Sequence, residues 1–168
     1  MHSGTGRTKL VADAMLGSLA RKLRAFGLDT AYYRTGDDSG IVQLARSEGR
    51  MIITADRGLA ALARSRGVAA LLATGRTDGA RISSLVDSAR SAGLPIVRGP
   101  ALCSLCGGSL EAISRADAAS SVSPSILRRH RIFLRCMSCG HLYWRGSHWK
   151  KLRRLERAFD SGPLAGDS

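Results

Sequence analysis

Short apolar runs alternate with segments of helical apolar spacing over residues 9–97. The apolar runs predict strands over 9–12, 30–33, 50–54 and 68–73. The segments between them predict four helices. These run over about 14–26, from after Asp38 to Gly49, from 56 to 67, and over about 79–92. Residues 95–97 either add one more strand or begin a linker. Strands joined by helices through short connections predict an α/β domain with a mainly parallel sheet flanked by helices.

The pattern changes after residues 99–100, where helical spacing stops and the first cysteines appear. Residues 114–125 are rich in Ser and Ala and predict a loop or mobile insertion. Residues 131–135 and 141–144 predict a hairpin, and 149–159 a basic helix. We therefore expect an α/β domain over 8–98, a cysteine-bearing module with a basic helix over 99–160, and a disordered tail over 161–168.

The net charge of the chain indicates which class of binding partner to expect. The chain has 26 Lys and Arg against 13 Asp and Glu, a net charge of +13, which favours nucleic acid over a merely soluble basic surface. No apolar run approaches the roughly 20 residues that span a bilayer, so we expect no membrane segment. The N-terminus also lacks the apolar core of a signal peptide, and we expect a cytoplasmic protein.

The four cysteines form two Cys-x-x-Cys-Gly motifs, at Cys103 and Cys106 and at Cys136 and Cys139. Two intervening residues allow both thiolates of a pair to reach one tetrahedral ion, and the following Gly permits a tight backbone turn. The pattern predicts a structural Zn²⁺ site. The alternatives are disulfides, which a cytoplasmic location disfavours, and redox pairs, which would open helices.

Acidic residues follow the first three predicted strands. Asp13 follows the first, Asp37 and Asp38 the second, and Asp56 the third. Because the carboxyl ends of parallel strands meet at one edge, a shared Mg²⁺ or Mn²⁺ would relieve their repulsion. The alternative is that each aspartate only caps a helix, which we expect of Asp13 and Asp56 in any case. Asp78 is a weaker candidate for a further acid.

A divalent cation on a basic protein points to a phosphodiester substrate, with the cation activating water. We expect Trp144, inside a strand, to belong to a small core, and Trp149, beside two lysines, to contact RNA. The candidates for RNA contact are Arg21, Arg24 and Arg57 near the acidic edge, and Arg145, His148, Trp149, Lys150 and Lys151 around the C-terminal helix.

Several stretches together resemble one known family. Residues 11–24 read Val-Ala-Asp-Ala-Met-Leu-Gly-Ser-Leu-Ala-Arg-Lys-Leu-Arg, residues 53–59 read Ile-Thr-Ala-Asp-Arg-Gly-Leu, and residues 143–149 read Tyr-Trp-Arg-Gly-Ser-His-Trp. With the two cysteine motifs, they are similar to the Mut-seven C-terminal RNase family over about residues 9–151. The resemblance implies a PIN-like nuclease domain fused to a zinc ribbon, and metal-dependent RNA cleavage that leaves a 5′-phosphate. By position, Asp13, Asp38 and Asp56 match the acidic motif, with Asp37 their neighbour.

Three functions fit these observations. The first is a metal-dependent endoribonuclease whose zinc ribbon and basic helix dock structured RNA, such as rRNA or the ribosome. The second is a non-catalytic RNA- or ribosome-binding factor in which the acids are only caps. The third is a toxin-like nuclease controlled by a protein inhibitor. Replacing Asp13 or Asp56 by Asn separates the first two, since only an enzyme would lose RNA cleavage.

Overall fold

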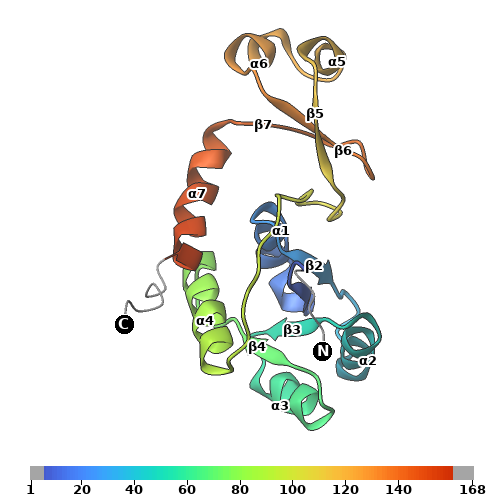
Figure 1. Ribbon diagram of the computed structural model, residues 1–168, viewed down its shortest axis with the longest axis vertical. Helices are drawn as coiled ribbons and strands as arrows, with labels where there is room; N and C mark the ends of the chain where they lie inside the picture. The colour runs from blue at the N-terminus through green and yellow to red at the C-terminus, as the bar shows by residue number, and fades with distance from the viewer. Residues whose placement is uncertain (1–5, 161–168) are drawn as a thin grey trace.

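A computed structural model describes residues 6–160 and contains the predicted parallel sheet. Its strands are β1 (Lys9–Ala12), β2 (Asp29–Tyr32), β3 (Met51–Thr54) and β4 (Ala70–Leu72), in the order β2-β1-β3-β4 (Figure 1). Val11 on β1 aligns with Ala31 on one side and Ile52 on the other. The α/β fold expected from the sequence is therefore confirmed.

Helices cover both faces of this sheet. They are α1 (Gly17–Ala25), α2 (Asp38–Glu48), α3 (Arg57–Ser65) and α4 (Asp78–Ser91). Alternate strand residues face opposite sides, so that Leu10 packs with α1 and α4 whereas Val11 packs with α2 and α3. The helix predicted over 14–26 is divided into a 3₁₀ turn, η1 (Ala14–Leu16), and α1, because the Asp13 carbonyl accepts from the Leu16 amide.

The cysteines lie in a second, antiparallel sheet of order β5-β6-β7. Its strands are β5 (Leu110–Ile113), β6 (Phe133–Cys136) and β7 (Leu142–Trp144), so the predicted hairpin is confirmed and β5 is an addition. With α5 (Arg115–Ala119) and α6 (Pro124–Arg129), these strands form what we call the cysteine module, at the upper end of Figure 1. The expectation that Trp144 is buried is wrong: it is 37% exposed on the last strand of the sheet.

The loop predicted over residues 114–125 is also wrong, because α5 and the start of α6 occupy it. The Ser114 hydroxyl caps α5 by accepting from the Asp117 amide at 3.0 Å, and Ala residues favour helix within it. Pro124 begins α6, where its missing amide hydrogen costs nothing. Ser114 and Pro124 therefore begin helices in a stretch that the sequence predicts to be a loop.

The C-terminal helix α7 (Ser147–Asp160) returns to the α/β domain and lies beside α4 (Figure 1). Leu152, Leu155 and Phe159 pack against the core of that domain. The Phe159 ring meets Phe26 edge-on at 5.7 Å, and Arg98 forms an ion pair of 2.8 Å with Glu156. The apolar side of this basic helix is thus in contact with the first domain. The predicted tail over 161–168 lies outside the described residues.

Residues 94–102 connect the two parts along the edge of α1. They contain no named strand, which agrees with the linker alternative. The Gly99 amide donates to the Gly27 carbonyl at 2.9 Å, and the Leu102 amide donates to the Arg24 carbonyl at 2.9 Å. A Cβ on Gly27 would lie 1.9 Å from the Gly99 oxygen, so this close approach requires glycine. Within residues 6–160, no helix combines the length and apolar character needed to cross a membrane.

Candidate active site and metal centre

The four predicted acids meet at the point where the strand order reverses. The chain passes from β2, on one side of β1, to β3 on the other, and ligands of parallel sheets bind outside the carboxyl ends of strands at such a point. A hollow of about 120 Å³ lies there, which we call the acidic hollow. It is lined by Asp13, Asp37, Asp38 and Asp56, together with Met15, Tyr33, Ile41 and Leu59.

Asp13 is the most constrained of these acids. It is only 8% exposed, and its Oδ1 accepts from the Met15 amide at 2.9 Å. Its Oδ2 accepts a short hydrogen bond from the hydroxyl of Thr54, which is fully buried at the end of β3. The Thr54 oxygen in turn accepts from the Asp56 amide at 2.9 Å. This chain of hydrogen bonds joins the ends of β1 and β3 and fixes the orientation of Asp13.

Asp37 and Asp56 begin α2 and α3 as N-caps. Asp37 uses both carboxylate oxygens, because Oδ1 accepts from the Ser39 amide at 3.2 Å and Oδ2 accepts from the Gly40 amide at 2.8 Å. Asp56 uses only Oδ1, which accepts from the Gly58 amide at 2.6 Å. The predicted caps at Asp13 and Asp56 are confirmed. In the described part of the chain, the Asp38 carboxylate and the Asp56 Oδ2 accept no hydrogen bond, so these oxygens remain for a ligand.

Asp78, the candidate for a further acid, does not line the acidic hollow. It opens α4 and forms an ion pair of 2.7 Å with Lys22, which neutralises it. The four acids line one hollow, but their carboxylate oxygens are not gathered as closely as the cysteine sulfurs. Within residues 6–160, only the cysteine group places three or more metal-ligating atoms within 4.8 Å of one another. No three of these acids therefore reach that spacing, and their catalytic role stays a prediction.

The cysteines, by contrast, already form a compact group. The Sγ atoms of Cys103 and Cys139 lie 3.6 Å apart, those of Cys106 and Cys136 lie 3.4 Å apart, and one ligand atom from each cysteine lies within 4.8 Å of the others. A disulfide would bring two sulfurs to about 2.05 Å. All four cysteines are free, so the disulfide alternative is contradicted. The group can hold a metal ion such as zinc.

The backbone around each pair has the conformation that the motif predicts. Gly107 has φ of 83° and Gly140 has φ of 74°, both in the left-handed region that favours glycine. The Gly108 amide points at the Cys106 sulfur at 3.4 Å, and the Cys139 amide points at the Cys136 sulfur at 3.5 Å. Amides directed at the sulfurs stabilise thiolates and orient them toward a shared ion.

The four thiols differ in acidity. Burial raises the pKa of Cys103, but hydrogen bonds from the Tyr143 hydroxyl, at 3.1 Å, and from backbone amides outweigh burial and lower this pKa to about 6. The Gly108 amide favours the thiolate of Cys106, yet the neighbouring sulfurs and desolvation outweigh it and raise the pKa of Cys106 to about 12. A cation bound among the sulfurs would favour the ionised form of all four.

The predicted RNA contacts fall in different surroundings. Arg21, Arg57, Arg145 and Lys151 are exposed, and Arg145 follows β7. Arg24 is buried: its Nε donates to the Thr30 carbonyl at 2.6 Å, and its Nη1 donates to the carbonyls of Ser104 and Leu105 at 3.2 and 2.9 Å. Arg24 thus joins α1 to the first cysteine pair. The side chains of His148, Trp149 and Lys150 lie outside the described part of the structure.

Arg34, two residues after β2, was not predicted as a site residue. Its guanidinium lies over the Tyr32 ring, 5.6 Å from the ring centroid. A cation immediately after a strand, at the edge that carries the acids, is the signal that identifies it. Arg34 extends the basic surface beyond the residues expected from the C-terminal helix.

Together these features define an α/β protein with an acid-lined strand edge, joined to a four-cysteine module that can hold a metal such as zinc. The family model described as Mut7-C RNAse domain matches residues 8–155, which include both sites, and the chain belongs to this family. The resemblance noted in the sequence is therefore confirmed. Membership points to ribonuclease activity and to RNA as substrate or partner. Searches of curated proteins and of solved structures returned no match.

Proposed function

We propose that this protein is a metal-dependent endoribonuclease of PIN-like type that hydrolyses phosphodiester bonds at the acidic hollow. The observation that carries the proposal is the meeting of Asp13, Asp37, Asp38 and Asp56 at the sheet's switch point, in a Mut7-C RNAse domain of net charge +13. Four clustered carboxylates on a basic protein are suited to a divalent cation and a polyanionic substrate.

The side chains differ in what they offer. Asp13 is fixed by Met15 and Thr54, so it would hold a cation at a defined place. Asp38 and the Asp56 Oδ2 are exposed oxygens that can adjust toward the cation and the RNA. Mg²⁺ or Mn²⁺ bound there would supply activated water and neutralise charge on the phosphate. Asp37 ranks behind the other three, because both of its oxygens are committed to capping α2.

The cysteine module has a separate role in the proposal. We assign structural Zn²⁺ to Cys103, Cys106, Cys136 and Cys139, since four thiolates complete a tetrahedral shell and leave no open position for chemistry. The zinc ribbon, Arg57 near the acidic hollow and the basic α7 would dock structured RNA in the cytoplasm, with rRNA as one candidate. The exposed Trp144 supplies an aromatic surface for an unpaired base.

The experiment is RNA cleavage in Mg²⁺ or Mn²⁺ by the wild type and by Asp56→Asn. Asn keeps the oxygen that caps α3 and replaces only the oxygen that faces a ligand, so the variant should fold normally. We expect a loss of at least about 100-fold, since even residues that merely support metal ligands cost 10–100-fold. Unchanged cleavage by Asp56→Asn and by Asp13→Asn would exclude the enzyme.

One observation favours the non-catalytic alternative. Asp13, Asp37 and Asp56 all cap helices, and the acidic oxygens do not share a point within 4.8 Å among the described residues. A factor that only binds RNA would need these aspartates for folding alone. It would bind RNA equally well with or without Mg²⁺, and Asp38→Asn, which removes no cap, would change neither binding nor stability.

A further inference from the structure

A second and larger cavity lies beside the acidic hollow, where α1 and β2 meet the cysteine module. Its volume is about 420 Å³. We call it the arginine pocket, because it is lined by Arg21, Arg24 and Arg34 together with Ser18, Tyr32 and Leu105. Leu105 stands between the first two cysteines, so the wall of this pocket comes from both parts of the molecule.

The two cavities lie on either side of the segment that leaves β2. Ala14 and Tyr33 line the acidic hollow, whereas Tyr32 and Arg34, on either side of Tyr33, line the arginine pocket. The Tyr32 hydroxyl donates to the Ala14 carbonyl at 2.8 Å, which ties the end of β2 to the segment that follows Asp13. An RNA strand that crosses residues 32–34 would pass both cavities, since these three consecutive residues line one or the other.

Within residues 6–160, no carboxylate forms an ion pair with the pocket arginines, although Cys103 and Cys106 lie close enough for their thiolates to attract Arg24. The ion pairs of Arg50 and Lys22 show that nearby acids are used elsewhere. Arg24 is partly committed to the Ser104 and Leu105 carbonyls. Its charge remains in the pocket wall, while Arg21 and Arg34 are exposed.

The shape of the donors fits a phosphodiester. Planar guanidinium groups bind phosphate oxygens in pairs, and the Tyr32 ring supports the guanidinium of Arg34 from one side. The pocket also opens at Gly17 and Ser18, the first residues of α1, where the helix dipole favours an anion. Acids thus lie on one side of residues 32–34, and cations with an anion-favouring helix end lie on the other.

We propose that the arginine pocket binds a backbone phosphate of the RNA strand next to the phosphate that is cleaved. The proposal rests on the proposed function for the identity of the strand. Arg21 and Arg34 bind the phosphate. Arg24 holds Leu105 and the first cysteine pair in place, and Leu105 forms part of the pocket wall. RNA bound in this way contacts the α/β domain and the cysteine module at once.

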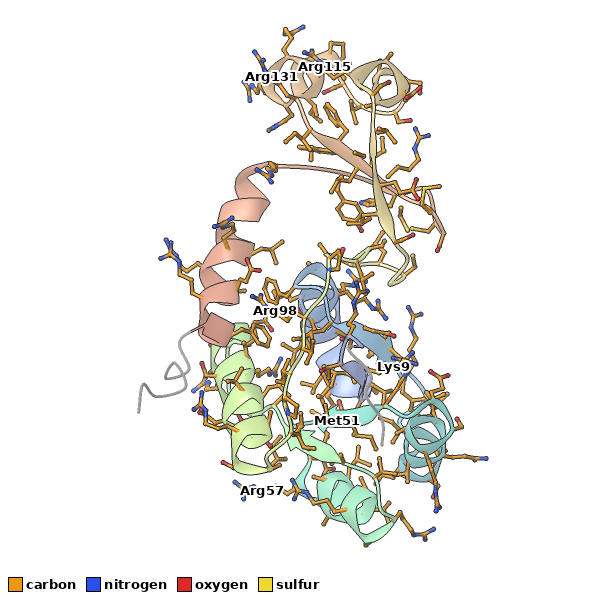
Figure 2. The ribbon with its side chains drawn as sticks, viewed as in Figure 1. Lys9, Met51, Arg57, Arg98, Arg115 and Arg131 are labelled. Atoms are coloured by element: carbon orange, nitrogen blue, oxygen red, sulfur yellow. The ribbon has the colours of Figure 1, made fainter. Side chains whose placement is uncertain are left out.

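The test measures binding of a labelled oligouridylate to an Asp56→Asn background, so that cleavage is not needed. One phosphate at a time is replaced by an uncharged methylphosphonate. In this background we expect one position at which the replacement weakens binding, and this loss should disappear in Arg21→Gln/Arg34→Gln. The salt slope of binding should fall by roughly 0.7 for each phosphate contact removed. Figure 2 places Arg131 in the cysteine module, which the proposed function assigns to RNA docking, so this arginine is unsuitable as a control. The charge-matched control is Arg46→Gln/Arg66→Gln, which removes two exposed arginines at the C-terminal ends of α2 and α3, opposite the N-caps that line the acidic hollow.

Two results would contradict phosphate binding in the arginine pocket. One is a methylphosphonate effect that persists in Arg21→Gln/Arg34→Gln, and the other is a salt slope of Arg46→Gln/Arg66→Gln that falls as much as that of the pocket variant. In otherwise wild-type protein, the pocket variants should raise KM for RNA cleavage and leave kcat unchanged. If the wild type does not cleave RNA, the proposed function fails. The methylphosphonate binding measurements still decide whether the arginine pocket binds a phosphate.

Discussion

The cysteine group and the acidic hollow, where we propose a second metal site, represent two ways of arranging metal ligands. The cysteine ligand atoms lie within 4.8 Å of one another, whereas among the described residues no three of the acids that line the hollow reach this spacing. The cysteine ligands come from two turns, each of them fixed by glycines and amides. The acids come from the ends of separate strands, and three of them also cap helices.

In the proposed function, this difference separates a structural ion from a catalytic one. A closed thiolate shell gives an ion no open position, so its binding energy stabilises the fold. An acidic edge that is partly open can take an ion, water and phosphate together, as Mg²⁺ sites commonly do. We therefore expect the two sites to respond differently when their ions or ligands are removed.

The largest effect should come from removing the metal of the cysteine module. Structural zinc contributes about 10–16 kcal/mol in small zinc modules, and this module has few buried apolar residues besides Leu102, Ala118 and Phe133. Chelation or Cys136→Ser should unfold the module and leave the α/β domain folded. Hydrogen exchange would show fast amides in β5–β7 and protected ones in β1–β4. Metal analysis should find about one zinc per chain in the untreated protein.

At the acidic hollow, the neighbouring residues Asp37 and Asp38 should differ in their effect on RNA cleavage. Asp38→Asn removes a carboxylate with no other role, and we expect it to lower kcat of RNA cleavage by at least about 100-fold, or about 2.7 kcal/mol. Asp37→Asn keeps a good cap and should have a much smaller effect. Both variants should unfold at the same urea concentration as the wild type. Equal losses of cleavage would contradict the assignment.

The connection between the α/β domain and the first cysteine pair depends on Arg24. Arg24→Met keeps the apolar stem but leaves the Thr30, Ser104 and Leu105 carbonyls without their donor, and we expect it to destabilise the protein by about 2 kcal/mol. Hydrogen exchange should accelerate around the first cysteine pair. Arg21→Met, on the same helix but exposed, is the matched control for stability. A destabilisation equal to that of the control would show that the contact contributes nothing.

The smallest effect should come from Thr54. Thr54→Val removes the donor to Asp13 and the acceptor of the Asp56 amide, which we expect to cost about 1 kcal/mol of stability and to lower cleavage. Thr54→Ser keeps the hydroxyl and should restore cleavage. A Val variant as active as the Ser variant would show that the orientation of Asp13 does not depend on this hydroxyl.

Patterns local in sequence predicted the α/β fold and the cysteine group well. Strand runs such as residues 50–54, caps such as Asp56 and the Cys-x-x-Cys spacing each act over a few residues, so they can be recognised without knowing the fold. The meeting of acids at one edge required one further step, from strand order to a shared edge. That step succeeded because parallel strands joined by short crossovers leave few topologies.

The predictions that failed depended on packing or on weak patterns. The strand β5 reads Leu-Glu-Ala-Ile, with its middle residues exposed, so it has no clear alternation. The helices α5 and α6 are short, and they begin at the Ser114 cap and at Pro124 rather than showing apolar spacing. The contact of Phe159 with Phe26 joins residues far apart in the chain, as does the contact of Arg24 with Leu105. Neither contact has a signature in the sequence.

The most direct measurement of the central claim is Mn²⁺ binding followed by electron paramagnetic resonance, with the cysteine site loaded with zinc. The wild type should bind Mn²⁺ at the acidic hollow, and Asp13→Asn/Asp56→Asn should lose that signal while keeping its zinc and its fold. Mn²⁺ binding of equal strength in the wild type and in this double variant would contradict the account.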